Sequence, residues 1–252
     1  MERVTVYAPG SSSNLGAGFD CLGLALDGCG DRVTAARSTR AGVRVVSVSD
    51  PRIPLENTRN TAALAAMGVL RRAGEDFGVE LEIQKGLPLA AGLGGSAASA
   101  VAGAVAAKAL VQEPLSRDGL LAAALEAEAA VSGGRHADNV APSLLGGAVL
   151  VASQEPLRFT TVRVHPSFSL VLVTPDYTVE TAKARSVLPG SVSRQDAVEQ
   201  AAHLAGLVLG LERGDPDLIR DCMTDRIAEP ARTALFPGYA AAFAAGVDAG
   251  AA

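Results

Sequence analysis

The sequence predicts a protein that mixes β-strands with α-helices, and two features of the chain indicate this. Stretches such as residues 3–9 and 79–83 alternate apolar and polar residues, which is the two-residue period of a half-buried strand. Longer alanine-rich stretches place apolar residues near helical spacing. With 252 residues, the chain is long enough for one large domain or two small ones.

The first half is predicted to alternate between strands and helices. Expected strands cover residues 3–9, 21–27, 41–49, 79–88 and 144–153. Expected helices cover residues 60–73, 96–111 and 116–131. Gly74 is a typical residue for the end of a helix, and Ser116 is a typical N-cap. Residues 132–143 are polar and contain paired glycines, so we expect a loop there.

The second half is predicted to begin near residue 155, within the sequence SQEP. We therefore expect one domain over residues 1–155 and another over residues 156–252. Two strands are expected at its start, and helices follow up to an alanine-rich segment at the end of the chain. The strands are expected at residues 157–165 and 168–175, and the helices at 179–188, 194–214 and 216–223.

Composition excludes several classes of protein. Apolar residues make up 48% of the chain and charged residues 19%, which is typical of a soluble globular protein. The longest apolar stretch, residues 96–111, is interrupted by Lys108 and is shorter than the ~18 residues of a membrane span, so no membrane partner is expected. The net charge of -5, without a basic cluster, argues against nucleic acid as a partner.

The N-terminus and the cysteines favour a cytoplasmic location. An acid and a base follow the first methionine, and no hydrophobic signal core follows them. The three cysteines, Cys21, Cys29 and Cys222, match neither a disulfide framework nor a zinc pattern, and we interpret them as small packing residues.

The sequence GLPLAAGLGGSAASA, residues 86–100, follows an expected strand and opens an expected helix. Backbone N–H groups at a helix start attract anions, and glycines allow a phosphate to approach the backbone closely. A Walker-type loop is excluded because no Gly-Lys-Ser/Thr ending is present. Residues 92–97 fit the loose dinucleotide pattern, but the nearest acid, Glu113, does not follow a second strand. The loop alone leaves an anion site and a structural turn equally open.

Glu128 falls on an apolar helical stripe with Leu121, Leu125 and Val131. A buried carboxylate is costly unless it is paired or binds a metal. The alternative, which the pattern alone favours, is that Glu128 lies at the edge of the stripe and reaches water. A serine such as Ser96 together with this glutamate would suit Mg²⁺, which takes few protein oxygens and keeps substrate phosphates.

Five segments together resemble the homoserine kinases, a family of the GHMP small-molecule kinases. They are APGSSSNLGAGFDCLGLALD, GLPLAAGLGGSAASA, HADNVAPSLLGG, TAKARSVLP and EPARTALFPG. The resemblance covers essentially the whole chain, in order. The glycine loop is shared across the superfamily, whereas the Asn-Leu-Gly-x-Gly-Phe-Asp core and HADNVAP are more specific.

The resemblance implies a fold, a reaction and partners. The expected fold class is α+β, with an N-terminal domain like ribosomal protein S5, a ferredoxin-like C-terminal domain and an active site between them. The implied reaction transfers a phosphoryl group from ATP to L-homoserine, giving ADP and O-phospho-L-homoserine for threonine biosynthesis. The family also implies Mg²⁺ as cofactor and a cytoplasmic homodimer.

The resemblance also implies roles for individual residues. Asp20 would bind the substrate ammonium, and Arg185 and Arg232 its carboxylate. The implied homoserine site consists of Asn14, Asp20, His136, Asn139, Arg185 and Arg232. The implied phosphate and nucleotide site consists of Pro88, Gly92, Leu93, Gly94, Gly95, Ser96 and Ala97, with Asn60 matching an adenine-side position. Ser96 and Glu128 match the pair that holds Mg²⁺.

Asn139 stands where related GHMP kinases carry a catalytic aspartate. Because an amide does not take up the proton of the substrate hydroxyl, we hypothesise that Asn139 orients this hydroxyl and that catalysis uses no strong protein base. Electrostatic stabilisation of the phosphates by Ser96, Glu128, Mg²⁺ and the helix dipole would supply the remainder.

The sequence departs from the family pattern in two ways. Gly95 replaces the first serine of the usual Gly-Leu-Gly-Ser-Ser, which removes a hydroxyl but keeps the backbone donor. A third glycine-rich motif expected soon after residues 236–238 is absent before residue 252, so we expect a C-terminally truncated chain. Three alternatives remain open: another GHMP-type kinase, a dinucleotide-dependent oxidoreductase, and a truncated, non-catalytic nucleotide binder.

Overall fold

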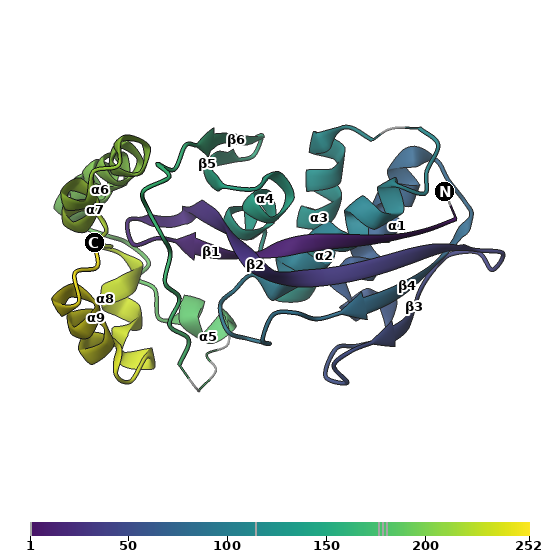
Figure 1. Cartoon of the computed structure of the whole chain (residues 1–252), viewed down its shortest axis with the longest axis horizontal. Coiled ribbons are helices and arrows are strands. Elements are labelled where there is room, and N and C mark those ends of the chain that lie inside the picture. The colour runs from purple at the N-terminus through teal and green to yellow at the C-terminus, as the bar shows by residue number, and fades with distance from the viewer. Residues whose placement is uncertain (1, 114, 176, 178, 180) are drawn as a thin grey trace. The chain divides into compact units, whose positions relative to one another are not determined.

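The computed structural model describes residues 2–113, 115–175, 177, 179 and 181–252 (Figure 1). The chain divides into two compact units. The first unit comprises Met1–Ser12 and Gly23–Gly146, and the second comprises Ser13–Leu22 and Gly147–Ala252. The short segment 13–22 therefore belongs with the second half of the chain. A functional domain boundary near residue 155 stays a prediction.

The strands of the first unit form a mixed sheet. The strands are β1 (Arg3–Asn14), β2 (Gly18–Ser38), β3 (Val43–Val48) and β4 (Gly78–Gln84). Strand β4 lies between β2 and β3, antiparallel to β2 and parallel to β3, and β1 also pairs with β2. Val79, Leu81 and Ile83 are buried and alternate with more exposed residues, so the predicted alternation in β4 is confirmed.

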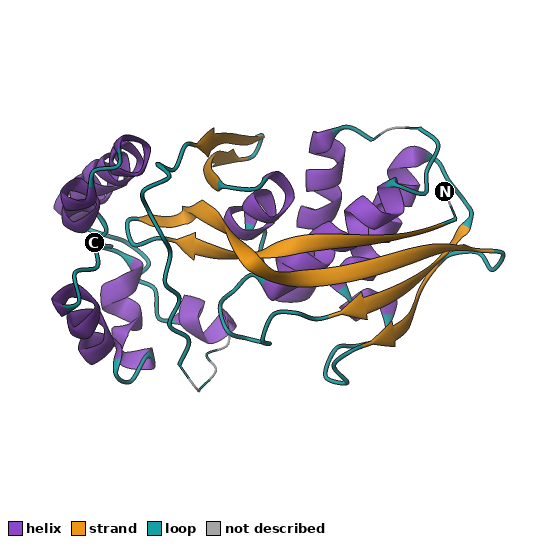
Figure 2. Cartoon of the chain, in the orientation of Figure 1, coloured by secondary structure: helices purple, strands orange, loops and turns teal. Residues whose placement is uncertain are grey.

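The helices of the first unit pack around a central alanine-rich helix (Figure 2). These helices are α1 (Thr61–Ala73), α2 (Gly95–Lys108), α3 (Arg117–Ser132) and α4 (Ala137–Leu145), and the short helix η1 (Asn57–Arg59) precedes them. Helix α2 contacts α1, α3, α4 and β4. A Cβ atom on Gly103 would lie 2.4 Å from the carbonyl oxygen of Ala62. Because the residues of α2 are small, neighbouring elements can approach its backbone closely, and α2 is buried on nearly all sides.

The second unit contains a strand pair followed by helices. Strands β5 (Ala148–Gln154) and β6 (Leu157–Val162) are antiparallel. The helices are α5 (Thr181–Ser186), α6 (Arg194–Arg213), α7 (Pro216–Cys222), α8 (Ala228–Arg232), η2 (Thr233–Leu235) and α9 (Tyr239–Asp248). The buried Gln200 of α6 donates to the carbonyl oxygen of Ala17 at 2.8 Å and accepts from the backbone N–H of Arg226 at 2.7 Å. This amide fastens the segment 13–22 to the helices of its unit.

Two sequence-based expectations about elements were wrong, and a third, a strand, was correct but too short. Residues 168–175 form no strand, and Val171 and Val173 are 83% and 81% exposed. An apolar run forms a stable strand only where another strand supplies hydrogen bonds, and none among the described residues does so here. The expected loop at 132–143 contains helix α4, whose Ala137, Val140 and Ala141 form a buried face at helical spacing. The expected short strand 21–27 is part of the longer β2, which continues through Gly28 and Gly30.

The succession of elements contradicts a dinucleotide-binding unit. After β4 the chain forms α2, α3 and α4 before the next strand, and β4 is antiparallel to β2. A dinucleotide site needs a second parallel strand directly after the first helix. In the parts of the chain that the structure describes, no helix combines the length and apolar character needed to cross a bilayer.

Candidate active site

The glycine loop adopts a backbone that glycine favours. Ala90, Gly92 and Gly94 have φ angles of 55°, 71° and 63° in the left-handed region. Gly94 is the N-cap of α2, and a Cβ atom on it would lie 2.1 Å from the Ser11 Oγ atom. A side chain at position 94 would displace the hydroxyl of Ser11. The loop therefore leads directly into the N-terminal turn of a 14-residue helix, where N–H groups attract anions.

Neighbouring elements hold this loop in place. The backbone N–H of Ser11 in β1 donates to the carbonyl oxygen of Leu93 at 3.1 Å. The hydroxyl of Thr61, at the start of α1, donates to the carbonyl oxygen of Ser96 at 3.1 Å. Pro88 is exposed and Ala97 is buried. Both sides of the helix entrance are thus fixed by the sheet and by α1.

Helix α4 brings Asn139 to the same loop. The buried Ser11 hydroxyl donates to the Asn139 Oδ1 atom at 3.0 Å. A Cβ atom on Gly94 would lie 3.1 Å from this same oxygen, so Asn139 abuts the N-cap of α2. Because Ser11 engages the amide oxygen, the carboxamide offers a substrate its NH₂ group, which is a donor. Ser11 is a residue that sequence reasoning missed, although it lies within the first motif.

Glu128 and His136 form a buried contact. Glu128 is 3% exposed, so the expectation that it reaches water was wrong. Its Oε1 atom lies 3.2 Å from the Nδ1 atom of His136, and Ser132 Oγ lies 3.2 Å from the same nitrogen. Within the described residues, Glu128 Oε2 and His136 Nε2 are buried without a hydrogen-bond partner. Buried polar atoms of this kind are costly unless a ligand satisfies them.

The unpartnered Oε2 atom of Glu128 fits a hard cation. Mg²⁺ binds carboxylate and hydroxyl oxygens and takes most of its remaining ligands from phosphates and water. Ser96 lies in the first turn of α2, and α2 packs against α3, which carries Glu128. In the described ranges, no hydrogen bond joins the side chains of Ser96 and Glu128. Nor do these ranges contain three or more His, Cys, Asp or Glu side chains grouped to hold a metal.

In the second unit, Asp20 and Arg185 form a bidentate ion pair. Arg185 Nη1 and Nη2 donate to the two carboxylate oxygens of Asp20 at 3.0 and 2.9 Å. The backbone N–H of Asp20 donates to the Asn14 Oδ1 atom at 3.0 Å. Asn14 and Asp20 have φ angles of 72° and 56°, so the segment between them is tightly curled. Three of the predicted homoserine-binding residues are thereby brought together.

Arg232 lies close to this pair. Its Nε atom donates to the carbonyl oxygen of Ala184 at 3.0 Å, and its guanidinium carbon lies 5.0 Å from the centre of the Phe19 ring. Burial lowers the pKa of Arg232, with the charge of Asp20 acting in the opposite direction and Arg185 lowering it further. Asp20 therefore acts electrostatically on both Arg185 and Arg232, and Asp225 also attracts Arg232.

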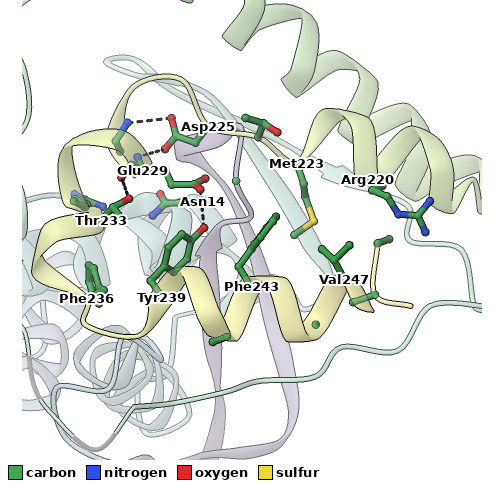
Figure 3. Close-up of a pocket in the computed structure, with 18 residues that line it drawn as sticks. Asn14, Arg220, Met223, Asp225, Glu229, Thr233, Phe236, Tyr239, Phe243 and Val247 are labelled. Carbon is green, nitrogen blue, oxygen red and sulfur yellow. Dashed lines mark hydrogen bonds between the residues drawn. The ribbon is translucent and has the colours of Figure 1, made fainter. Parts of the chain in front are cut away.

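A cavity of about 440 Å³ lies in the second unit and is lined by Asn14 and Arg232 (Figure 3). Helix α9 presents Phe243 and Val247 to it. The Tyr239 hydroxyl donates to Glu229 Oε1 at 2.7 Å across one wall, and burial followed by this glutamate raises the pKa of Tyr239. The cavity thus combines two predicted substrate residues with an apolar wall.

Asn60 has a structural task in helix α1. It caps the helix, with its Oδ1 atom accepting from the N–H of Ala63 at 3.1 Å, and its Nδ2 atom donates to the carbonyl oxygen of Pro54 at 2.8 Å. Both ends of the side chain are therefore engaged. The expected adenine-side role of Asn60 stays a prediction.

The fold and the glycine loop define the class of protein. Residues 60–147 match the family model described as the GHMP kinases N terminal domain. The fold also resembles the crystal structure of the Methanococcus jannaschii mevalonate kinase, with a TM-score of 0.55 over 89% of this chain and 77% of that one. At 11% identity this likeness concerns the fold alone. The chain is thus a GHMP kinase of the α+β class.

More similar relatives specify the family. The chain is 42% identical to the homoserine kinase of Xylella fastidiosa strain 9a5c, over 98% of this chain and 77% of the relative. It is 41% identical to that of Halorubrum lacusprofundi, over 98% and 81%. The crystal structure of homoserine kinase from Cytophaga hutchinsonii superposes with a TM-score of 0.92 at 38% identity, covering 99% of this chain and 80% of that one. The chain belongs to the homoserine kinase family.

Proposed function

We propose that this chain transfers the γ-phosphoryl group of ATP to the side-chain hydroxyl of L-homoserine, giving ADP and O-phospho-L-homoserine. Its membership of the homoserine kinase family supports the reaction. One structural observation carries the proposal furthest: Ser11 joins the glycine loop, through Leu93, to the amide of Asn139. The element suited to phosphates and the residue suited to a hydroxyl are therefore fixed to each other.

The N-terminal turn of α2 would bind the phosphates. Gly92, Gly94 and Gly95 keep side chains away from the backbone, and the helix dipole adds partial positive charge. Pro88, Leu93, Ser96 and Ala97 complete the proposed loop. The phosphates gain a preorganised site because β1 and α1 already hold it.

Glu128 and Ser96 would hold Mg²⁺ at this site. The bound ion would neutralise charge on the phosphate oxygens. Glu128 itself is poised for this because one carboxylate oxygen contacts His136 while the other, within the described residues, lacks a partner. The His136 contact would fix the orientation of the carboxylate. We therefore propose that His136 acts through Glu128 as well as near homoserine.

Asn139 would orient the homoserine hydroxyl. Its amide oxygen accepts from Ser11, so its NH₂ group would donate to the hydroxyl oxygen. A carboxamide does not take up a proton near neutral pH, so the hydroxyl proton would pass to an oxygen of the transferred phosphoryl group while ADP leaves. Rate enhancement in this account comes from positioning and charge stabilisation, which dominate phosphoryl transfer.

Asp20, Arg185 and Arg232 would recognise the amino-acid end of homoserine, with Asn14 supporting Asp20. Arg185 and Asp20 neutralise each other in this structure through two hydrogen bonds. A zwitterion offers replacements for both: its carboxylate suits a guanidinium, and its ammonium suits the aspartate. A substrate that lacks its carboxylate or its ammonium would separate Asp20 from Arg185 and leave one of these two residues without a new partner. This cost predicts selectivity for amino acids.

A substrate panel tests the proposal. ADP release would be measured with Mg·ATP and L-homoserine, 4-hydroxybutyrate or mevalonate, after circular dichroism has shown that the chain is folded. We expect release that depends on L-homoserine, with a kcat/KM at least about 100-fold lower for 4-hydroxybutyrate because Asp20 then lacks its ammonium partner. Equal release with mevalonate would favour another GHMP-type substrate. ATP binding without any release would support a non-catalytic nucleotide binder.

We further propose, from the family resemblance, that the protein acts as a homodimer in the cytoplasm. From the charge and composition of the chain, we propose that neither nucleic acid nor a membrane is a partner. Sedimentation velocity of the purified chain tests the dimer. A single species at the monomer mass of 25.5 kDa across micromolar concentrations would contradict it.

A further inference from the structure

A buried lysine lies beneath the glycine loop and has no place in the reaction described above. Lys85 follows β4 directly, and its side chain is 6% exposed. Its Nζ atom forms an ion pair with Asp31 of β2, whose side chain is fully buried. Nζ also donates to the carbonyl oxygen of Gly95 at 2.8 Å and to the Ser99 Oγ atom at 3.0 Å. All three ammonium hydrogens therefore have acceptors.

Both carboxylate oxygens of Asp31 also have hydrogen-bond donors. Its Oδ2 atom accepts from the Ser99 hydroxyl at 2.6 Å, and its Oδ1 atom accepts from the backbone N–H of Gly86 at 3.1 Å. The network joins β2, the segment after β4, and the first two turns of α2. A complete buried network of this kind holds its members in one arrangement.

Stability alone is a weak explanation for this network. The desolvation of two buried charges often cancels their attraction, and apolar residues of similar size frequently serve as well. A cation at the N-terminus of a helix also opposes the helix dipole, so Lys85 is unfavourable there without a compensating negative charge. Asp31 supplies that charge in the structure. A phosphate bound at the same helix end would be a second favourable partner for Lys85.

Resting on the proposed function, we propose that Lys85 is a positioning residue that fixes the first turn of α2 for the nucleotide phosphates. Its bond to the Gly95 carbonyl oxygen determines where the N-terminal turn lies. Because Asp31 balances its charge, Lys85 acts through the position of this turn rather than through added net charge. Sequence reasoning passed over Lys85 because its partners, Asp31 and Ser99, lie 54 and 14 residues away.

The test removes both charges together, so that no unpaired buried ion remains. The double variant Asp31→Asn, Lys85→Met keeps an acceptor for the Gly86 N–H and similar side-chain volumes. Lys108→Met, at the opposite end of α2, is the matched control. For each protein, kcat and the separate KM values for ATP and L-homoserine would be measured, together with ADP affinity by titration calorimetry and the melting temperature.

We expect the double variant to fold and to bind ADP about tenfold or more weakly, since a charge-assisted hydrogen bond to the loop is lost. The KM for ATP should rise by a similar factor, with the KM for L-homoserine within about twofold of the parent value. Unchanged ADP affinity in the folded double variant would overturn the inference. An equal loss in Lys108→Met would also overturn it.

The calorimetric readout separates this inference from the proposed function. If the parent chain binds ADP but does not phosphorylate L-homoserine, the proposed reaction fails while the role of Lys85 is still tested by ADP affinity. If the double variant does not fold, the conservative variant Lys85→Arg takes its place. It keeps the charge but changes the donor geometry, so the inference then requires weaker ADP binding with an unchanged melting temperature.

Discussion

Ser11 serves two parts of the proposed site with two different groups. Its backbone N–H holds the carbonyl oxygen of Leu93, and its side-chain hydroxyl holds the amide oxygen of Asn139. The first contact does not depend on the side chain, but the second does. A single substitution can therefore separate the orientation of Asn139 from the conformation of the loop.

We expect Ser11→Ala to lower kcat by about tenfold, because the amide of Asn139 loses the hydrogen bond that selects its donor-presenting orientation. The KM for ATP should change little, since the backbone contact to Leu93 remains. Steady-state kinetics with both substrates measure this. Ser143→Ala is the control, because the Ser143 hydroxyl also joins α4 to β1, donating to the Pro9 carbonyl oxygen at 2.7 Å rather than to Asn139. A similar fall in kcat in both variants would contradict the orienting role.

Gly94 and Gly95 are adjacent but differ in what they tolerate. A Cβ atom on Gly95 would meet Lys85 Nζ at 3.4 Å and Leu87 Cβ at 3.7 Å, which are ordinary contacts. Gly95→Ala should therefore stabilise the protein by about 0.5–1 kcal/mol, by restricting the unfolded chain. Gly94→Ala should destabilise it by about 1–2 kcal/mol from the left-handed backbone alone, and further through the clash with Ser11. Urea unfolding of both variants would reveal the contrast, and equal effects would contradict it.

Asp20 should affect substrate binding far more than stability. The Asp20 and Arg185 side chains are 38% and 39% exposed, so solvent screens their attraction. We expect Asp20→Asn to raise the KM for L-homoserine by about tenfold or more, because the ammonium loses its anionic partner. The melting temperature should stay within a few degrees. Asp217→Asn, which breaks the exposed pair with Arg220, serves as the control. A large loss of stability with an unchanged KM would count against recognition by Asp20.

At the scale of elements, the sequence pattern correctly predicted those helices and strands whose formation depends on neighbouring residues in the chain. The helix after Ser116 begins where predicted because the serine side chain accepts from the N–H of Gly119 at 3.1 Å. Alternation in β4 was a reliable signal because one face of that strand is buried. Helix α4 was missed because its polar N-terminal residues resemble a turn. Its apolar face became visible only through packing against α2 and α3.

Residues 168–175 are the opposite case, because a strand was predicted there and the structure has none. Leu170, Val171, Leu172 and Val173 form a continuous apolar run of the kind found in strands, yet they lack a neighbouring strand among the described residues. We expect the amide hydrogens of residues 170–173 to exchange rapidly with solvent, because no backbone hydrogen bond among the described residues protects them. The amides of Leu81 and Ile83 in β4 provide the protected reference. Slow exchange at both places would show that residues 170–173 are paired in solution.

At the scale of the whole molecule, the sequence predicted the kind of site but not its supports. The glycine loop and Asn139 were selected as candidates from motifs, because each is carried by a few consecutive residues. Glu128 was selected from its place on a helical stripe and from the family resemblance. The contacts that hold them were not predicted, since Ser11 and Asn139 are separated by 128 residues. The burial of Glu128 was also misjudged, because its position on the helical stripe could not reveal how α3 packs.

The roles of the residues rest on one reaction, and one measurement tests that reaction most directly. The purified chain would be mixed with Mg·ATP and L-homoserine, and phosphorus NMR would follow the nucleotide and any new phosphate ester. The account predicts a phosphomonoester whose phosphorus resonance coincides with that of authentic O-phospho-L-homoserine. The intensity of this resonance should increase in step with that of ADP. Two results would contradict it. One is ATP binding by a folded chain without this signal, and the other is formation of ADP and inorganic phosphate in equal amounts at a rate that does not depend on L-homoserine.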